Sequence, residues 1–391
     1  MKSRESLAAL EMERRVTARR GFLRQGLVAS TLGAVGAGLT GCGGSEAATL
    51  DELPKVRFKT NQDPTKIWLR SATPVELLDT PEIRAAVDQA RALAGDDDYL
   101  LNLQRLQCND FDDTYTIVQT PGSNTMPASA TTSGRKERAA EPTKVFDNVY
   151  YVGGYEVGGW LIDTGDGYIM LDSSYDYGYD EILIPNMRKL GLDPNKVKSI
   201  LITHAGPDHL GATRKFQDNH GTRIIYSAPI APNPAWLPLA PVTTVVKDGD
   251  TLTQGNTTIT IVSTPRTVGG TGLSFFIPVS VNGVKHLWAT YGNTGIVGTL
   301  ADKAVYTSAI RNFIDNHVTR LRPDIAISSH PFVDGSGTRL EMLRQGRAGM
   351  ANPFLIGAEA AKTYFEIMAQ AVTVQAMRQA AGLNASGTAR L

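Results

Sequence analysis

From residue 145 onward, short apolar runs alternate with glycine-rich turns, a pattern that predicts successive β-strands. Runs at 149–152, 160–163 and 168–172 are rich in Val, Ile, Leu, Tyr and Trp, which favour extended structure. A Gly-Asp-Gly segment at 165–167 separates the last two runs and has the composition of a hairpin turn. The main folded part of the chain is therefore expected to begin with antiparallel strands.

The preceding segment shows a helical pattern instead. Thr80 and Pro81 suit an N-cap and a first helical position. Apolar residues then recur at helical spacing, at Ile83, Ala86, Val87, Ala90 and Leu93. A Gly-Asp-Asp-Asp segment at 95–98 interrupts the pattern, which resumes at 99–106. The sequence therefore predicts a broken helix over 75–108.

After residue 175, predicted helices and strands alternate to the end of the chain. Helices are predicted at 179–190, 209–217 (with Asp208 as N-cap), 300–318, 338–349 and 356–380, and strands at 200–202, 222–226, 257–263, 272–279, 284–290 and 324–328. Strands flanked by helices in two similar halves are typical of an α/β fold built as an αββα sandwich.

One stretch, residues 198–210, combines a buried strand with a cluster of reactive side chains. Its apolar run at 200–202 ends abruptly in polar residues, as in a strand that delivers its carboxyl end to a site. His204, Asp208 and His209 then follow within six residues. Imidazoles and a carboxylate at such a position are suitable ligands for zinc or iron. On spacing alone, a polar loop with two surface histidines explains the stretch equally well.

The same stretch resembles the signature of the metallo-β-lactamase superfamily, Thr-His-x-His-x-Asp-His, which lies between a strand and a helix. Here the segment at 203–209 reads Thr-His-Ala-Gly-Pro-Asp-His, so Gly206 stands where the second histidine would be. The resemblance implies the αββα sandwich of the metallo-β-lactamase fold and the activity of a metal-dependent hydrolase. It also implies that Asp172 lies at the floor of the site and supports the metal ligands.

The resemblance extends to other positions, one of which has also changed. His204 matches the first histidine of the signature, Asp208 and His209 match its Asp-His pair, and His330 matches the last ligand of the superfamily. The middle histidine normally follows Thr-Pro-Gly, but this chain reads Thr-Pro-Arg-Thr at 264–267. The surrounding sequence is most similar to the subclass that has no cysteine ligand.

The two missing histidines would both be ligands of the same metal ion in the superfamily. In the superfamily, one ion is held by the two histidines of His-x-His and by the middle histidine, so only His204 of that set remains. The other ion is held by residues that correspond to Asp208, His209 and His330, all of which are present. We therefore expect at most one metal, with zinc as the leading candidate and ferrous iron as the alternative.

The changed ligand set suggests roles for the remaining polar residues. Asp208 and His204 are the candidate catalytic residues, with His204 acting as a general base or orienting water once it is free of metal. Arg266, in the loop that lost its histidine, is a candidate to bind a carboxylate or phosphate of the substrate. Either His204 or Arg266 could equally be a remnant without function.

The leading hypothesis is an exported hydrolase that uses one metal to activate water. Its substrate would be an ester, thioester, lactone, β-lactam or phosphoester, since the fold accommodates all of them. A binding or scaffold protein built on a degenerate metallo-β-lactamase fold is one alternative, and a mononuclear iron oxidoreductase is another. About one zinc per chain, no metal, or iron would distinguish the three.

The first 42 residues have the composition of an export signal. The segment around Arg19 and Arg20 resembles a twin-arginine motif, and a weakly apolar stretch at 26–41 is too short for a stable membrane span. It ends in Leu-Thr-Gly followed by Cys42, which resembles a lipobox whose cysteine is acylated. An ordinary secretory signal with an incidental cysteine is the alternative. The prediction is a lipoprotein in the periplasm or at the cell surface.

The rest of the chain divides into two parts. Residues 43–142 are predicted to form a polar tether, the helical N-terminal extension and a loop rich in Pro, Ser, Thr, Ala and Gly, and residues 143–391 the metallo-β-lactamase-like domain. Cys42 and Cys108 are the only cysteines, so lipidation would leave no internal disulfide. Lys plus Arg and Asp plus Glu number 39 each, a balance that does not favour nucleic-acid binding. The expected partners are a small-molecule substrate and, through the lipid anchor alone, a membrane.

Replacing Cys42 tests the anchor. Cys42→Ser should move the protein from the membrane fraction to the soluble exported fraction, because the acylated residue is lost. Immunoblotting of fractionated cells measures this, with Cys108→Ser as the matched control. A Cys42→Ser protein that stays in the membrane fraction contradicts the lipobox interpretation.

Overall fold

The computed structural model describes residues 78–109, 139–228, 240–346 and 351–385. All of them belong to one compact unit, Ala48–Leu391. Arg19, Arg20 and Cys42, the polar tether and most of the 120–142 loop lie outside the described residues, so those assignments stay predictions. Within the described ranges, no helix combines the length and apolar character that a membrane crossing requires.

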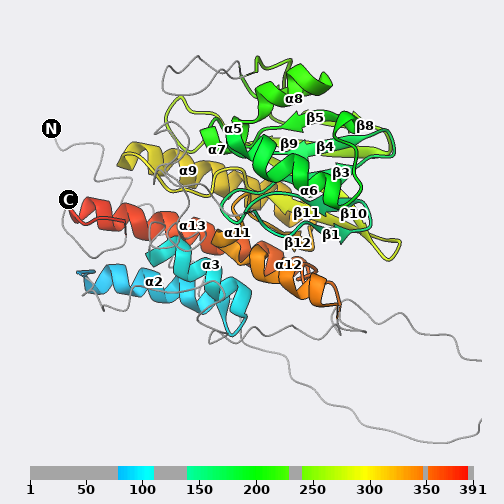
Figure 1. The fold of residues 1–391 in the computed structure, drawn as a ribbon. Helices are drawn as coiled ribbons and strands as arrows, with labels where there is room; N and C mark the ends of the chain where they lie inside the picture. Colours follow the sequence, from blue (N-terminus) through cyan, green and yellow to red (C-terminus); the bar gives the residue numbers. More distant parts are fainter. Residues whose placement is uncertain (1–77, 110–138, 229–239, 347–350, 386–391) are drawn as a thin grey trace, which may run out of the picture. The chain divides into compact units, whose positions relative to one another are not determined.

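Among the described residues, the first of two β-sheets contains seven strands in sequential order (Figure 1). They are β1 (Thr143–Phe146), β2 (Val149–Tyr151), β3 (Trp160–Asp163), β4 (Tyr168–Leu171), β5 (Val197–Leu201), β6 (Arg223–Tyr226) and β7 (Thr244–Val245). The strands from β1 to β4 pair antiparallel, as the turn at 165–167 predicts. From β4 to β7 the pairing is parallel.

The second sheet contains five strands in the order β12-β11-β10-β9-β8. They are β8 (Thr251–Gln254), β9 (Thr257–Ser263), β10 (Leu273–Val281), β11 (Val284–Thr290) and β12 (Ile325–Ala326). The predicted hairpin around Asn282 and Gly283 is present, with both residues at positive φ. In the described part of this sheet, β11 and β12 pair parallel and the other neighbours antiparallel.

The two sheets pack face to face through apolar side chains. Trp160 of β3 and Trp288 of β11 are fully buried, and their ring centroids lie 5.2 Å apart. Tyr151 packs edge-on against Trp160 at 4.7 Å. Large aromatic rings at this interface bury much apolar surface from both sheets, which is the main source of stability for a sandwich.

Helices cover the outer face of each sheet (Figure 1). The first sheet carries α5 (Asp176–Gly178), the π-helix η2 (Tyr179–Leu183), α6 (Ile184–Lys189), the 3₁₀ turn η3 (Pro194–Lys196), α7 (Pro207–Leu210) and α8 (Thr213–His220). The second sheet is followed by α9 (Leu300–Asn312), the π-helix η4 (Phe313–Val318), α10 (Thr319–Leu321), α11 (Pro331–Asp334), α12 (Ser336–Gln345) and α13 (Ala358–Ala380). These layers confirm the predicted αββα sandwich.

The predicted broken helix forms two helices, α2 (Pro81–Ala94) and α3 (Asp98–Asn109). Thr80 is the N-cap of α2 and accepts a hydrogen bond from the backbone N–H of Ile83. Both helices contribute buried side chains to clusters that include α13. Cys108 is a free, buried thiol in one of these clusters, and burial raises its pKa to about 11. The N-terminal extension therefore packs into the core of the folded unit.

A buried ion pair joins the two ends of the described chain. Arg378 of α13 makes two hydrogen bonds to Asp79, at 2.8 and 2.7 Å, and both side chains are almost completely buried. The same guanidinium donates to the carbonyl groups of Cys108 and Ala385. One side chain thus holds together the start of α2, the end of α3 and the chain after α13.

Removing the cation of this pair should destabilise the protein strongly. Arg378→Met leaves the carboxylate of Asp79 buried without its partner, which costs about 3–5 kcal/mol in the free energy of unfolding. Chemical denaturation measures the loss. Arg322→Met is the control, since Arg322 pairs with Glu359 at the surface and such pairs contribute about 0–1 kcal/mol. Equal effects of the two substitutions would show that the buried pair does not hold the extension in place.

Candidate active site

The candidate site lies where parallel strands of both sheets end. Asp172 directly follows β4, and His204 follows β5 after two residues, in the parallel part of the first sheet. His330 follows β12, which pairs parallel with β11 in the second sheet. The carboxyl ends of parallel strands point to one edge of a sheet, where α/β proteins commonly bind ligands. The fold therefore brings together residues that are distant in sequence.

The segment after β5 differs from the prediction, because the helix expected at 209–217 begins earlier and is divided into α7 and α8. Gly206, not Asp208, is the N-cap of α7, and Pro207 occupies the first helical position. Proline suits that position because its φ is helical and it has no N–H to leave unpaired. Asp208 and His209 therefore lie in the first turn of α7, with the carboxylate of Asp208 16% exposed and the ring of His209 fully buried.

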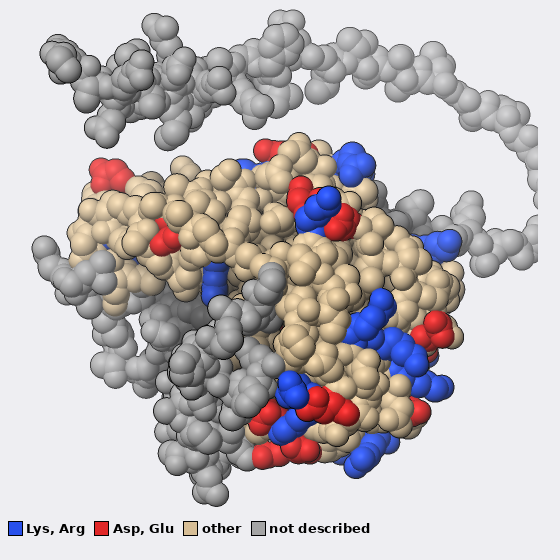
Figure 2. Space-filling view, turned by 90° about the horizontal axis from the view of Figure 1, so that it is seen from above, with Lys and Arg blue, Asp and Glu red and all other residues tan. Residues whose placement is uncertain are grey.

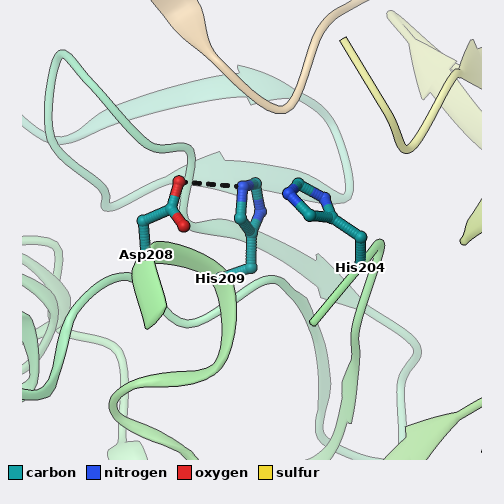
Figure 3. Close-up of side chains that lie close together, drawn as sticks. All are labelled: His204, Asp208 and His209. Carbon is teal, nitrogen blue, oxygen red and sulfur yellow. Dashed lines mark ion pairs between the residues drawn. The ribbon is translucent and has the colours of Figure 1, made fainter. Parts of the chain in front are cut away.

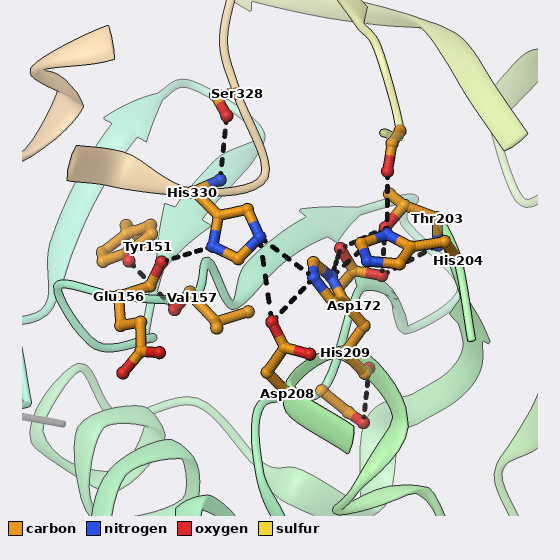
Figure 4. Close-up of polar contacts among 12 residues, drawn as sticks. Tyr151, Glu156, Val157, Asp172, Thr203, His204, Asp208, His209, Ser328 and His330 are labelled. Atoms are coloured by element: carbon orange, nitrogen blue, oxygen red, sulfur yellow. Dashed lines mark hydrogen bonds and ion pairs between the residues drawn. The ribbon is translucent and has the colours of Figure 1, made fainter. Parts of the chain in front are cut away.

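Three potential ligand atoms converge at this turn (Figure 4). Nε2 of His209 lies 3.0 Å from Oδ2 of Asp208 and 3.2 Å from Nε2 of His330. Nε2 of His330 lies 3.8 Å from the same carboxylate oxygen. A tetrahedral zinc ion with bonds of about 2.0–2.1 Å needs ligand atoms roughly 3.3 Å apart. Asp208, His209 and His330 therefore fit one such ion.

The other ring nitrogen of each histidine is already paired. Nδ1 of His209 donates to Oδ2 of Asp172 at 2.8 Å, and Nδ1 of His330 donates to the backbone carbonyl of Glu156, also at 2.8 Å. With the proton on Nδ1, the lone pair of Nε2 is directed at the shared point. Carboxylate and carbonyl partners of this kind fix the orientation of metal-binding histidines and strengthen them as ligands.

The charges around His209 favour a cation at this point. Burial lowers the pKa of His209, but the carboxylates of Asp208 and Asp172 outweigh that effect and raise it to about 10. Burial would raise the pKa of Asp208, and the imidazole of His209 lowers it instead. Burial lowers the pKa of His330 to about 4. Without metal, a proton on His209 therefore satisfies the two carboxylates, and a metal ion would take its place.

Asp172 and Thr203 form the support beneath the ligands. Oδ1 of Asp172 accepts the backbone N–H of Thr203 at 2.9 Å, and Oδ2 accepts the Thr203 hydroxyl at 2.8 Å. The backbone N–H of Asp172 donates to the carbonyl of Leu201. Asp172 has a φ of 55°, a conformation that is costly for a non-glycine residue. These bonds lie in the position that the sequence predicts for a support of the ligands.

His204 lies beside this set (Figure 3). Its ring centroid is 3.9 Å from that of His209, and its Nδ1 donates to the carbonyl of Gly292 at 2.9 Å. Ligand atoms of His204, Asp208 and His209 all lie within 4.8 Å of one another. These three side chains are therefore also close enough to hold a metal ion. Burial, and then the charges of His209 and Arg266, hold the pKa of His204 well below its usual range.

The residues at the two positions where further histidines are expected do not suit a second metal ion. A Cβ added at Gly206 would lie 3.3 Å from Nε2 of His204, so a histidine there would face His204, but glycine offers no ligand. Arg266 stands in the 264–267 segment, where the middle histidine is expected, and its guanidinium repels cations. Of the three histidines expected for a second ion, His204 is therefore the one that the described residues retain.

Sequence reasoning did not find a buried network that supports the loop carrying His330. Oδ2 of Asp334 accepts the backbone N–H of Ser328 at 2.6 Å and the hydroxyl of Tyr99 at 3.0 Å. The Tyr99 hydroxyl also donates to the carbonyl of Ala326 at the end of β12. Tyr99 belongs to α3, so the N-terminal extension helps to hold this loop. Asp334 follows His330 closely in sequence, but nothing in the sequence connects Tyr99 with either residue.

The structure thus brings Asp208, His209, His330 and His204 together and places Arg266 on the His204 side of them. Glu156 was also not predicted, because it acts through its backbone carbonyl, which any residue type would supply. The surface charges are mixed in the face shown in Figure 2, where Lys and Arg side chains lie among Asp and Glu.

Comparison with known proteins identifies the fold. The family model described as the metallo-β-lactamase superfamily matches residues 157–304. BJP-1, a subclass B3 metallo-β-lactamase of Bradyrhizobium japonicum, is 24% identical over 62% of this chain and 96% of its own, with a TM-score of 0.53. FEZ-1, a metallo-β-lactamase from Legionella gormanii, is 21% identical over 63% of this chain and 98% of its own, with a TM-score of 0.55. At these identities the structural likeness shows the shared fold.

The support beneath His209 can be tested by substitution. Asp172→Asn replaces a charged acceptor of the His209 N–H by a neutral amide, so the affinity for zinc should fall about 10–100-fold. Competition with a chromophoric chelator measures this affinity. Asp166→Asn, in the exposed turn after β3, is the control and should leave it unchanged. Unaltered affinity in Asp172→Asn would mean that the carboxylate does not strengthen this ligand.

Proposed function

We propose that this chain, which belongs to the metallo-β-lactamase superfamily, is an exported hydrolase that uses a single zinc ion. Members of the superfamily are mostly metal-dependent hydrolases. The observation that carries the proposal is the convergence of Asp208, His209 and His330, whose ligand atoms lie 3.0–3.8 Å apart. Two imidazoles and one carboxylate are a ligand set that zinc accepts while keeping a position open.

Zinc bound to this set would lower the pKa of a water molecule towards about 7 and polarise the bond under attack. Asp208 lies at the solvent-accessible edge of the set, with 16% of its side chain exposed, so water and substrate can approach from this side. Asp172 and Glu156 keep both histidine rings in the orientation that binding needs. These residues supply a rigid site before any ligand arrives, which reduces the cost of binding.

His204 is the proposed general base. Its low pKa keeps the ring neutral near pH 7, and its Nδ1 is engaged by the carbonyl of Gly292. Nε2 therefore carries a lone pair that can accept a proton from water during attack on the substrate. With a single zinc ion, this proton transfer would be a task of the protein itself.

The substrate is proposed to be an ester, thioester, lactone, β-lactam or phosphoester, all of which react with an activated water. The site of action is proposed to be outside the cytoplasmic membrane, with Cys42 as the lipid anchor and a twin-arginine signal for export. The composition at residues 1–42 supports this location. The protein would therefore act on small molecules in the periplasm or at the cell surface.

Metal analysis of purified variants tests the ligand set. The wild-type protein should contain about one zinc per chain, and His330→Ala or Asp208→Ala should contain almost none, because two remaining ligands do not offset the desolvation of the ion. His204→Ala should retain its zinc but lose hydrolytic activity. His220→Ala, which changes a histidine bonded to Tyr179 and Asn195, is the control and should keep both.

The outcomes separate the possible functions. Two metals per chain, or a metal-free His204→Ala protein, would show that the ligand set is wrong. Protein without metal from the exported fraction would favour a non-catalytic binding protein. Iron in place of zinc would favour an oxidoreductase.

A further inference from the structure

Arg266 stands in the 264–267 segment, where the resemblance places the missing histidine. It lies in the loop between β9 and β10 and is half-buried. A Cβ added at Gly295 would lie 3.2 Å from the Nη1 atom of Arg266 and 3.9 Å from Cγ1 of Val297. The guanidinium therefore extends to the 291–297 loop, whose residue Gly292 holds the ring of His204.

This guanidinium has no counter-ion in the part of the chain that the structure describes. No hydrogen bond or ion pair connects Arg266 with a described residue. Arg311 and Arg378, by contrast, are each paired with a carboxylate, Arg311 with Glu366 and Arg378 with Asp79. A partly buried charge without a partner is costly, so an anion that enters the site would be bound strongly.

The positive charge of Arg266 acts on the His204 side of the site. After burial and His209, it is the next cause that lowers the pKa of His204. Burial raises the pKa of Tyr226 and of Tyr306, and the charge of Arg266 opposes the rise in both. Tyr226 lies at the end of β6 and Tyr306 in α9, so the charge of Arg266 acts on residues of both elements.

The loops beside Arg266 offer further contacts for a ligand. The hydroxyl of Thr294, next to Gly295, is buried and has no hydrogen-bond partner among the described residues. Val268 and Val297 are exposed apolar residues on the two neighbouring loops, 66% and 42% accessible. Asp302 ties these loops together, since it accepts the backbone N–H groups of Val268 and Thr299. The exposed residues on the loops beside the Arg266 guanidinium thus include the apolar side chains of Val268 and Val297.

We propose that Arg266 binds a carboxylate group of the substrate, and that this carboxylate is attached to an apolar body that lies against Val268 and Val297. The planar guanidinium pairs with a carboxylate through two parallel hydrogen bonds. The inference rests on the proposed function, which places the bond to be cleaved at Asp208, His209 and His330. It specifies the substrate class as a carboxylate-bearing ester, lactone or amide, with Arg266 standing where the superfamily holds its second cation.

Calorimetric titration with benzoate, a carboxylate on an apolar ring, tests the inference on the purified protein as isolated. Arg266→Gln should weaken benzoate binding about 10- to 100-fold, the effect of losing charge-assisted hydrogen bonds. Arg266→Lys should keep part of the benzoate affinity, because lysine retains the positive charge but lacks the two parallel N–H donors of the guanidinium. Arg214→Gln, which removes an exposed arginine paired with Asp218, is the control and should bind like wild type.

Two further measurements separate this inference from the proposed function. Zinc content should be the same in Arg266→Gln as in wild type, and benzoate binding should persist in His330→Ala and still depend on Arg266. Binding that disappears in His330→Ala but is unchanged in Arg266→Gln would place the carboxylate on the metal and overturn the inference. Inorganic phosphate that binds at Arg266 more tightly than benzoate would overturn the carboxylate class. A wild-type protein without zinc that still shows Arg266-dependent benzoate binding would refute the hydrolase and leave the inference standing.

Discussion

The carboxylate of Asp172 is the interaction on which the site depends. It accepts the ring N–H of His209 and both the backbone and the hydroxyl of Thr203, so it fixes the turn that carries His204 at one end and His209 at the other. Asp172 can do this because β4 and β5 are parallel neighbours that end side by side. Its positive φ shows that the backbone accepts strain to aim this side chain. The apolar core between the sheets supplies the stability that the strain requires.

The two sides of the site differ, because the ligands of one set are present and those of the other set are replaced. Around Asp208, His209 and His330, each imidazole has its Nδ1 proton held by an acceptor and its Nε2 directed at the shared point, and the nearby carboxylates favour a positive charge. On the other side, Gly206 offers no ligand and Arg266 brings a permanent positive charge. On that side the guanidinium of Arg266 can therefore take the place of a metal cation. The side with the carboxylates of Asp208 and Asp172 still needs a proton or a metal ion.

The N-terminal extension contributes to this arrangement as well as to stability. Its helices α2 and α3 pack with α13, and Arg378 joins the beginning and end of the described chain at Asp79. Through the hydroxyl of Tyr99, α3 reaches Asp334 and the end of β12, just before His330. A segment that precedes the strands of the sandwich thus supports one of the candidate metal ligands.

The sequence by itself determined the local structure and the identity of the candidate ligands. Apolar spacing, the Thr80 cap and the turns at 165–167 and 282–283 predicted the elements, because such signals act over a few residues. The motif at 203–209 and His330 indicated, by resemblance, which ligands are present and which are lost. Only the tertiary structure decided that Glu156 holds His330 through its backbone, and that Tyr99 supports Asp334. These contacts join residues up to 235 positions apart, and they depend on how the two sheets and their helices pack, which no local pattern encodes.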